Sequence, residues 1–274
     1  MSLMPPRIFL VGPVLLVGEL VLVWLCENAR PLRRQTCAKW ARAKVNVAMA
    51  IAGGLAMSVL YGPIVFSAIV FSSRHGLGLL RLLALPSALR WLRWPLSFLL
   101  LDYTLWVWHR LTHRVPLLWR FHAIHHADLD LDVTTALRFH AGELVASVPY
   151  RALQGLVFGI DLAPLLAWEI GVLLCAQLHH SNIRLPLRLE TQLQRVFITP
   201  RLHGTHHSID ADEVSANFGT MLSLWDRLHG THLWRGDQQP RVIGIPEARA
   251  PLSGWQALRM PFTRQPLPVP ERRE

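Results

Sequence analysis

Long apolar runs separated by short basic stretches dominate the first part of this chain. The run Ile8 to Cys26 spans nineteen residues with Glu19 as its single charge, and the run Val45 to Phe71 carries no charge over twenty-seven residues. About 20 apolar residues in a helix are enough to cross the hydrocarbon core of a bilayer. We therefore expect both runs to be retained membrane helices, the second either tilted or re-entrant at Gly53 and Gly54.

Further apolar stretches follow with different spacing of polar residues. Residues 73–93 mix leucines with four arginines, which predicts an amphipathic helix at the membrane interface. The run Trp94 to Trp108 is short for a span and leads directly into His109. The runs Leu144 to Ile160 and Leu162 to Leu178 predict a hairpin that enters the membrane and returns on the same side, so that the segments before and after it lie together.

Composition supports a membrane protein and not a nucleic-acid binder. Hydrophobic residues make up 51% of the 274 residues, and the mean hydropathy is +0.28. The net charge of +10 comes from basic residues that flank apolar runs instead of lining one polar helix face, so we expect no nucleic-acid partner. The loop between the first two spans should be cytoplasmic and the N-terminus external, because that loop carries Arg30, Arg33, Arg34, Lys39, Arg42 and Lys44. The three cysteines form no CxxC pair and predict no disulfide framework.

Histidines are concentrated in clusters with helical spacing. Five of the fourteen lie between Asp102 and His126, where His109 and His113 are four residues apart. Residues three or four apart share one face of a helix, so their imidazoles can share an ion. Two further groups have the spacing HxxHH, and they comprise His122, His125 and His126, and His203, His206 and His207. Three such groups in one chain predict a metal site.

The number of histidines favours two metal ions, since one zinc usually takes three or four protein ligands. Imidazole suits iron, zinc, copper and nickel, so the ligands alone do not name the metal. A pair of axially ligated haems would leave the neighbouring histidines unexplained, and a zincin-type protease would need HExxH, which does not occur. A non-enzymatic, metal-handling membrane protein stays open as an alternative function.

The same residues carry a family resemblance. The motifs DYxxxxxHRxxH, LWRFHxxHH, RxHxxE, HSNxRLP, PRxHxxHHS and NxGxxLxxWDRLxGT occur in this order between Leu85 and His232. Together they resemble the fatty acid hydroxylase or sterol desaturase superfamily of membrane di-metal oxygenases. The resemblance implies a centre of two iron ions, with zinc as a substitute, that uses O2 and an external electron donor to hydroxylate or desaturate a lipid.

The resemblance also assigns candidate residues. It implies nine metal ligands, namely His109, His113, His122, His125, His126, His180, His203, His206 and His207. His140 matches an RxHPxE motif whose proline is Ala141 here and ranks below His180, while His229 and His232 are expected at the surface. Asp102 and Asn182 are candidate catalytic residues that orient the ligands, with Glu143 and Asp226 as weaker candidates for that task.

These observations predict an all-α integral membrane protein. We expect about four transmembrane or membrane-embedded helices with a cytoplasmic, helical, histidine-rich metal-binding cap. The expected regions are a membrane anchor at 1–93, a catalytic core at 94–235 and a proline-rich basic tail at 236–274. The expected location is a bacterial inner membrane with the metal site facing the cytoplasm.

Overall fold

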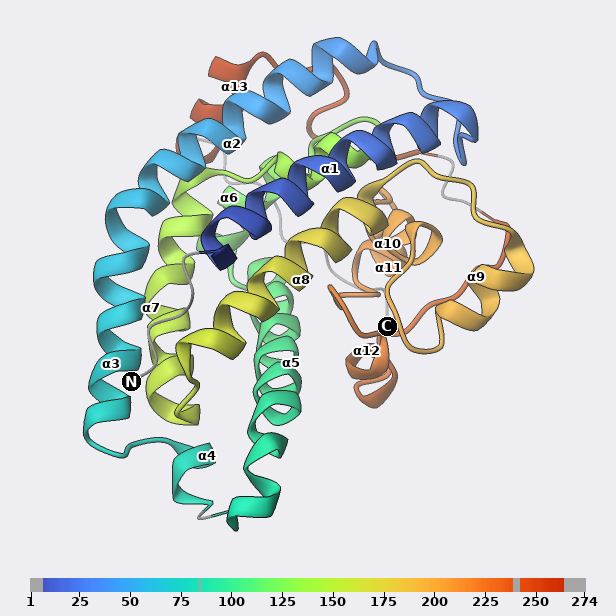
Figure 1. Ribbon diagram of the computed structural model, residues 1–274. Coiled ribbons are helices and arrows are strands. Elements are labelled where there is room, and N and C mark those ends of the chain that lie inside the picture. Colours follow the sequence, from blue (N-terminus) through green and yellow to red (C-terminus); the bar gives the residue numbers. More distant parts are fainter. Residues whose placement is uncertain (1–6, 84, 239–241, 264–274) are drawn as a thin grey trace.

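The computed structural model describes residues 7–83, 85–238 and 242–263, and the regular elements within them are all helices (Figure 1). The longer helices are α1 (Arg7–Ala29), α2 (Lys39–Tyr61), α3 (Ser67–Arg74), α5 (Arg93–Arg114), α6 (Pro116–His126), α7 (Ala141–Phe158) and α8 (Leu162–His180). The short ones are α4 (Leu79–Leu82), α9 (Leu187–Leu193), α10 (Pro200–His206), α11 (Ala211–Val214), α12 (Leu224–Leu228) and α13 (Gly254–Arg259). A π-helical turn, η1 (Gly62–Phe66), joins α2 to α3, and the 3-10 turns are η2 (Ser87–Leu92), η3 (Val133–Leu137) and η4 (Met260–Phe262).

Within the described ranges, three helical segments are long and apolar enough to cross a membrane, namely Val11–Ala29, Lys39–Leu82 and Leu162–His180. Their apolar side chains point largely outward, as shown by Val14, which is 71% exposed, and Val59, which is 69% exposed. Such continuous apolar surface fits a surrounding of lipid tails. The two predicted N-terminal spans and the hairpin helices are therefore present as helices, and the expected all-α class is confirmed.

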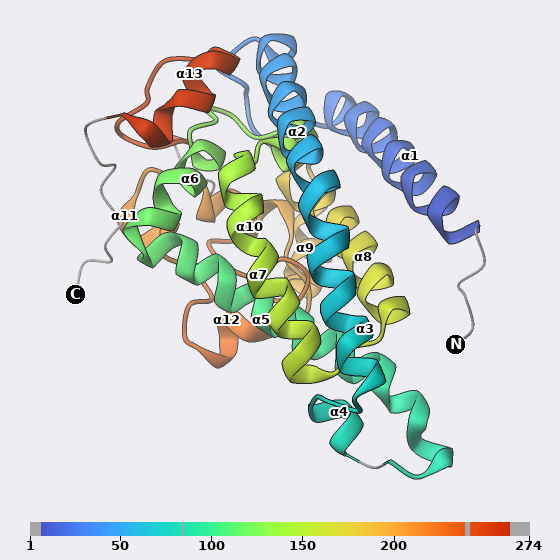
Figure 2. The same cartoon turned by 90° about the vertical axis from the view of Figure 1, so that its left-hand side faces the viewer.

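The membrane-facing helices pack around a shared apolar core. Helices α2, α3, α5, α7 and α8 lie side by side in both views (Figures 1 and 2). Val65, Ile69, Leu101, Val148 and Trp168 are buried between them. Burying side chains of this size stabilises the fold by about 1.5–3 kcal/mol each. This bundle fixes the end of α5, where the first histidine pair lies, against the end of α8.

The predicted amphipathic helix over residues 73–93 is wrong, because the chain there is broken into two short turns. Gly76 and Gly78 have φ values of +64° and +104°, which L side chains rarely adopt and which end α3. A Cβ on Gly78 would lie 2.2 Å from the backbone nitrogen of Gly159, so this bend needs glycine to pack against the end of α7. The α4–η2 segment consequently lies at the opposite end of the molecule from α13 (Figure 2).

A buried ion network fixes the segment that follows α6. Arg42 of α2 donates to Asp128 and Asp132 at 2.6 Å each and to the carbonyl oxygen of Asp130 at 2.7 Å. Both carboxylates are almost completely buried. Asp132 also caps η3 by accepting a hydrogen bond from the Thr134 backbone. The segment between α6 and α7 is thereby tied to α2, next to the histidines that end α6.

The C-terminal region is ordered where it is described. α13 and η4 pack on α2 and α6, and Ala257 is fully buried there. The described part of the proline-rich region, residues 242–263, is thus docked on the bundle through α13 and η4, while residues 239–241 and 264–274 of the expected tail lie outside the described residues.

Candidate metal centre

Four helix segments bring nine histidines together at one end of the bundle. The last two turns of α5 supply His109 and His113. α6 begins at Pro116, and proline suits the first position of a helix because no backbone N–H is needed there. α6 supplies its three histidines, α8 ends at His180, and α10 supplies the last group with its N-terminus capped by Thr199. These nine are the residues that the sequence resemblance assigned.

The nine histidines divide into two compact groups. In the five-histidine cluster the candidate ligand atoms all lie within 4.8 Å of one another, and its members are His109, His113, His122, His126 and His206. The four-histidine cluster meets the same limit and consists of His125, His180, His203 and His207. Both clusters are buried apart from the half-buried His109. Two sites for one ion each are therefore available within the described residues.

Nitrogen atoms in both clusters face one another at contact distance. In the five-histidine cluster the Nε2 atoms of His109 and His206 are 3.1 Å apart. In the four-histidine cluster the Nε2 of His180 lies 3.0 Å from that of His125 and 2.9 Å from that of His203. The Nε2 of His203 in turn lies 3.1 Å from that of His207. In each cluster the nitrogens thus converge on a common point.

The hydrogen bonds behind these rings fix which nitrogen carries the proton. The Nδ1 of His109 donates to the Phe218 carbonyl and the Nδ1 of His206 to the Ala216 carbonyl, both at 2.7 Å. Since a carbonyl only accepts, each Nδ1 carries the proton, and each Nε2 of a neutral ring is an acceptor. Two acceptors then face each other at 3.1 Å without a proton between them. A cation held by both lone pairs resolves this contact, so the residues fit a metal ion.

Burial keeps the rings neutral, as metal ligation requires. Burial lowers the pKa of His206 to about 3 and also lowers those of His203 and His207. Both ring nitrogens of His113 and of His126 lack a hydrogen-bond partner within the described part of the chain. An unsatisfied buried polar group costs about 1–3 kcal/mol. Bound metal ions would remove this cost.

The depressed pKa values predict how the metal-free protein responds to acid. Below pH 6.5 the unfolded chain binds protons at His206 that the folded chain binds only near pH 3, so stability falls as the pH drops through that window. The slope is about 1.4 kcal/mol per pH unit for each such group. We expect chelator-treated protein to unfold at a clearly lower temperature at pH 5 than at pH 7.5. An unchanged unfolding temperature would mean that these rings are not buried as neutral groups.

One carboxylate directly supports a candidate ligand. Glu143, in the first turn of α7, accepts a hydrogen bond of 3.0 Å from the Nδ1 of His122. This leaves the His122 Nε2 as an acceptor, and that atom is buried without a partner in the described chain. The carboxylate makes the ring more basic and holds its orientation. Glu143, the weaker candidate from the sequence, therefore has the contact that was expected of an orienting acid.

We predict that Glu143→Gln weakens metal binding without unfolding the protein. The amide keeps the shape but loses the charge that supports the His122 imidazole. Loss of such a supporting group lowers metal affinity about 10–100-fold. Chelator competition on the purified variant measures the change, and Glu247→Gln, at an exposed glutamate outside both clusters, is the matched control. Equal affinity in variant and parent would show that Glu143 does not support the site.

A backbone segment contributes contacts that the sequence did not reveal. The carbonyl oxygens of Ala216, Phe218 and Thr220 accept hydrogen bonds from the Nδ1 atoms of His206, His109 and His179, respectively. Asn217, between two of them, has a left-handed φ of 56° and donates to the Leu202 carbonyl. The NxG motif at Asn217 and Gly219 was the sequence signal for this segment. It did not predict the hydrogen bonds, because the direction of a backbone carbonyl does not depend on which side chain the residue carries.

Asp226 holds that segment in place. Its carboxylate accepts from the backbone N–H groups of Phe218 and Gly219 at 2.9 and 2.8 Å and from the Trp106 indole at 2.9 Å. It also accepts from the Thr231 hydroxyl. Asp226 thus acts on His109 through the Phe218 carbonyl and not by direct contact.

The two residues expected to be catalytic have other partners. Asp102 accepts hydrogen bonds from the Trp225 indole at 2.7 Å and from the Leu222 backbone N–H at 3.3 Å. Trp225 of α12 therefore takes the hydrogen bond that a histidine ligand such as His109 was expected to make. Asn182 exchanges two hydrogen bonds of 2.8 Å with the Arg33 backbone and thereby clamps the loop after α1. Within the described residues neither side chain bonds a histidine. Their part in catalysis stays a prediction.

Sequence reasoning missed one buried histidine. His179 precedes His180, and its Nδ1 donates to the Thr220 carbonyl at 3.1 Å. Its ring lies 4.1 Å from that of His203, outside the two clusters but beside them. The doubled HH that also occurs at 125–126 and 206–207 was the available clue.

The remaining histidines lie away from the clusters. His140 caps α7 by accepting from the Gly142 N–H at 2.9 Å, which explains its place in the RxHxxE motif. His229 is exposed as expected and stacks on Trp106 at a centroid distance of 4.2 Å. His232 is half-buried and contacts Gln194. A Cβ on Gly204 would meet the Arg33 guanidinium at 2.5 Å, so a larger residue there would require that side chain to move.

An apolar cavity of about 310 Å³ opens beside both clusters. His109 and His122 of one cluster and His125, His180 and His203 of the other line it together with His179. Its walls come from α5, η3, α7 and α8, and include Leu105, Trp108, Leu137, Leu144, Val172 and Leu173. Trp108 lines the cavity, whereas Trp119 packs on His113. An apolar chain in this cavity would reach both clusters.

A basic residue lies on the cavity wall inside the bundle, in addition to Glu143. Arg151 of α7 lines the cavity and lies 4.0 Å from Glu169 of α8. The hydroxyl of Tyr61 also bonds Glu169, and the Arg151 guanidinium lies 5.1 Å from the centroid of the Trp168 ring. These contacts offset the cost of placing charges at this depth.

The fold and the site define an all-helical, membrane-associated protein with two histidine clusters that can hold metal ions. The chain belongs to the fatty acid hydroxylase family, whose model matches residues 94–231, half of the sequence. This confirms the family resemblance carried by the six motifs. No solved structure matches the chain significantly.

Several relatives support the same assignment. The chain is 32% identical over 185 residues to the ornithine lipid hydroxylase OlsE of Rhizobium tropici, a match that covers 63% of this chain and 53% of that protein. It is 24% identical over 187 residues to the alkylglycerol monooxygenase of Homo sapiens, covering 66% and 38%. It is 29% identical over 174 residues to the fatty acid hydroxylase vlmA of Lecanicillium sp, covering 56% and 47%. The match therefore spans about half or less of these relatives.

Proposed function

We propose that this protein is a membrane-bound di-iron oxidoreductase that uses O2 and an external electron donor to hydroxylate a lipid. The observation that carries the proposal is the meeting of two neutral histidine clusters at the wall of one apolar cavity. Relatives named as lipid hydroxylases and monooxygenases support hydroxylation over desaturation.

The five-histidine cluster would hold one ion and the four-histidine cluster the other. Four pairs of Nε2 atoms in these clusters lie 2.9 to 3.1 Å apart, close enough for both members of a pair to bind one ion. Imidazole ligands suit iron as well as zinc. When bound, the two irons supply the dioxygen chemistry that oxidises an unactivated C–H bond.

The residues of this chain prepare the site in three ways. Carbonyls of residues 216–220 and the Glu143 carboxylate fix the proton on the Nδ1 of each supported ring, so that Nε2 is free to bind. The walls from α5, α7 and α8 exclude water and orient an apolar chain along the clusters. His179, with its Nδ1 bonded to Thr220, presents a further polar ring to the same cavity.

The contacts of the basic loop after α1 support a cytoplasmic position for the metal site. Asp130, two residues beyond the Asp128 that follows α6, accepts from the backbone of Thr36 and Cys37, and Asn182 clamps Arg33. The histidines therefore lie on the same side as this loop. Because basic loops stay in the cytoplasm, we place the centre on the cytoplasmic face of a bacterial inner membrane.

The proposal is tested by comparing lipids from cells with and without the protein. We expect one lipid class to gain a single oxygen atom by mass spectrometry when the protein is present, together with oxygen consumption in isolated membranes. A variant with His203→Ala should lose both changes, while the exposed His229→Ala should keep them. Loss of two hydrogens without added oxygen would assign desaturation instead. Metal binding without oxygen consumption would favour a metal-handling protein.

A further inference from the structure

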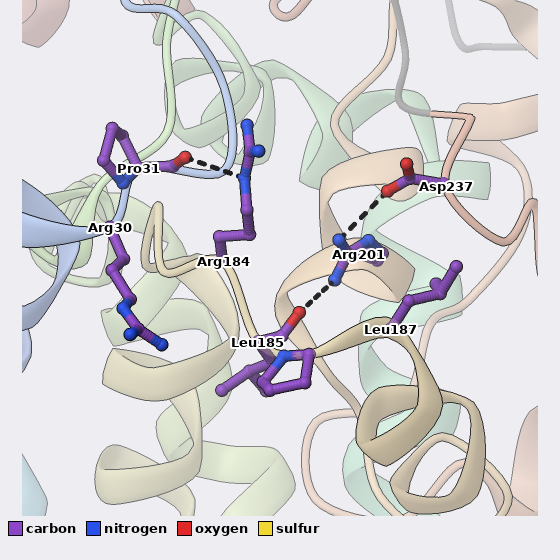
Figure 3. A pocket seen from close by; sticks show the side chains of 8 residues that line it. Arg30, Pro31, Arg184, Leu185, Leu187, Arg201 and Asp237 are labelled. Carbon is purple, nitrogen blue, oxygen red and sulfur yellow. Dashed lines mark hydrogen bonds and ion pairs between the residues drawn. The ribbon is translucent and has the colours of Figure 1, made fainter.

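A second and larger cavity lies where two candidate spans end on the histidine side of the molecule. Its volume is about 640 Å³, and Arg30 and Arg184 line one side with Arg201 and Asp237 across from them (Figure 3). The loops that carry it are joined by backbone hydrogen bonds, including one of 2.8 Å from the Arg184 N–H to the Arg30 carbonyl. The cavity is therefore a built feature of the fold.

Two of the three arginines keep an uncompensated charge. Arg201 is buried and paired with Glu190 and with Asp237, so its charge is neutralised. Arg184 donates from Nε to the Pro31 carbonyl at 3.2 Å. This hydrogen bond orients the guanidinium, but the carbonyl has no formal charge and does not neutralise it. Arg30 is exposed. Within the described residues no acidic side chain pairs with Arg30 or Arg184. The cavity thus offers two positive charges to an anion.

The position of the cavity indicates where that anion comes from. The candidate span in α1 ends at Ala29, directly before Arg30, and the span in α8 ends at His180, four residues before Arg184. On the other rim, α9 exposes Leu187 at 40% and Leu189 at 49%. Apolar surface on both rims places the arginines at the boundary between lipid tails and water. Basic pockets at the cytoplasmic ends of membrane helices bind anionic lipid headgroups.

We propose that this cavity binds the phosphate of an anionic phospholipid headgroup through Arg30 and Arg184. The acyl chains would lie along the exposed apolar face of α1, which includes Leu22 and Leu25. The site is separate from the histidine clusters and involves no metal or turnover. It therefore stands or fails independently of the proposed hydroxylase activity.

The test titrates detergent-purified protein with phosphatidylglycerol or phosphatidylcholine and counts bound lipid by native mass spectrometry. We expect one phosphatidylglycerol to bind at least about tenfold more tightly than phosphatidylcholine. Arg30→Gln with Arg184→Gln should weaken phosphatidylglycerol binding about 30-fold, since each basic side chain near the membrane contributes roughly fivefold. Arg188→Gln, an exposed arginine of α9 outside the cavity, is the matched control and should change binding less than about twofold.

Three results would overturn the proposal. The first is equal binding of the two lipids, and the second is a double variant that binds phosphatidylglycerol as tightly as the parent. The third is glycerol phosphate binding as tightly as the lipid, which would assign the cavity to a free phosphate. If the double variant fails to fold, Arg30→Gln is tested alone, since that exposed side chain makes no bond within the described fold and its loss should leave folding intact. The expected loss of phosphatidylglycerol affinity is then about fivefold.

Discussion

Replacing His125 by alanine is expected to reduce bound metal from two ions to one per chain and to abolish lipid oxidation. The His125 Nε2 lies 3.0 Å from that of His180, and the ring is held by stacking on Phe139 at 4.4 Å. Its removal leaves three histidines in the smaller cluster. Losing a group that only supports a ligand already lowers metal affinity or activity about 10–100-fold. Because His125 is a candidate ligand itself, we expect turnover to fall by more than about 100-fold.

The control for this variant is His229→Ala, which removes an exposed imidazole of the same size outside both clusters. Metal analysis and oxygen uptake are measured on both proteins in the same detergent, and membrane insertion is compared by extraction at high pH. Insertion should be unchanged in both, because His125 makes no contact with the lipid-facing surface. Retained turnover together with two metals in His125→Ala would remove this residue from the centre.

The second large effect is expected at Arg42. Arg42→Met keeps the length of the side chain but leaves the buried carboxylates of Asp128 and Asp132 without their cation. Breaking a buried ion pair from one side costs about 3–5 kcal/mol. Burial alone would raise the pKa of Asp128, but Arg42 outweighs it and lowers that pKa to about 2, so the carboxylate is charged at neutral pH. We expect the free energy of unfolding to fall by that amount.

Denaturant unfolding in mixed micelles, followed by tryptophan fluorescence, measures this change. Lys44→Met, two residues along α2 and exposed, is the matched control and should unfold like the parent. A second expected result distinguishes loss of the ion pairs from loss of side-chain packing at Arg42. Acidification from pH 4 to pH 2 should destabilise the parent more than it destabilises Arg42→Met. In the parent the unfolded chain takes up a proton at Asp128 in this range, whereas the folded chain resists protonation until about pH 2. Equal stability of the two proteins at pH 7 would show that the ion pairs do not hold this segment.

Local helical geometry explains why the ligands could be found from the sequence. The pairs His109 with His113, His122 with His126, and His203 with His207 are each four residues apart, and each pair falls within one cluster. Adjacent residues of a helix point about 100° apart, so His125 and His126 belong to different clusters. The pairs four residues apart could therefore be read from the spacing. The division into five and four could not, because His122 and His125, and likewise His203 and His206, are three residues apart and fall in different clusters.

Contacts made over long distances in the chain could not be predicted in this way. Asp102 shares a face of α5 with His109, yet the indole of Trp225 reaches its carboxylate first. The carbonyls of residues 216–220 hold the rings, and their direction depends on backbone angles set by Asn217 and Asp226. Residues 73–93 have the composition of an amphipathic helix, but positive φ values at Gly76 and Gly78 interrupt it. In each case tertiary packing decided the outcome.

The most direct test is the metal content of the protein purified in detergent from cells grown with iron. Two iron ions per chain, falling to about one in His125→Ala, would agree with a five-histidine and a four-histidine site. Tightly bound zinc that cannot be exchanged for iron without loss of activity would contradict the di-iron centre. A single ion per chain that is unaffected by His125→Ala would contradict the division of the histidines into two sites.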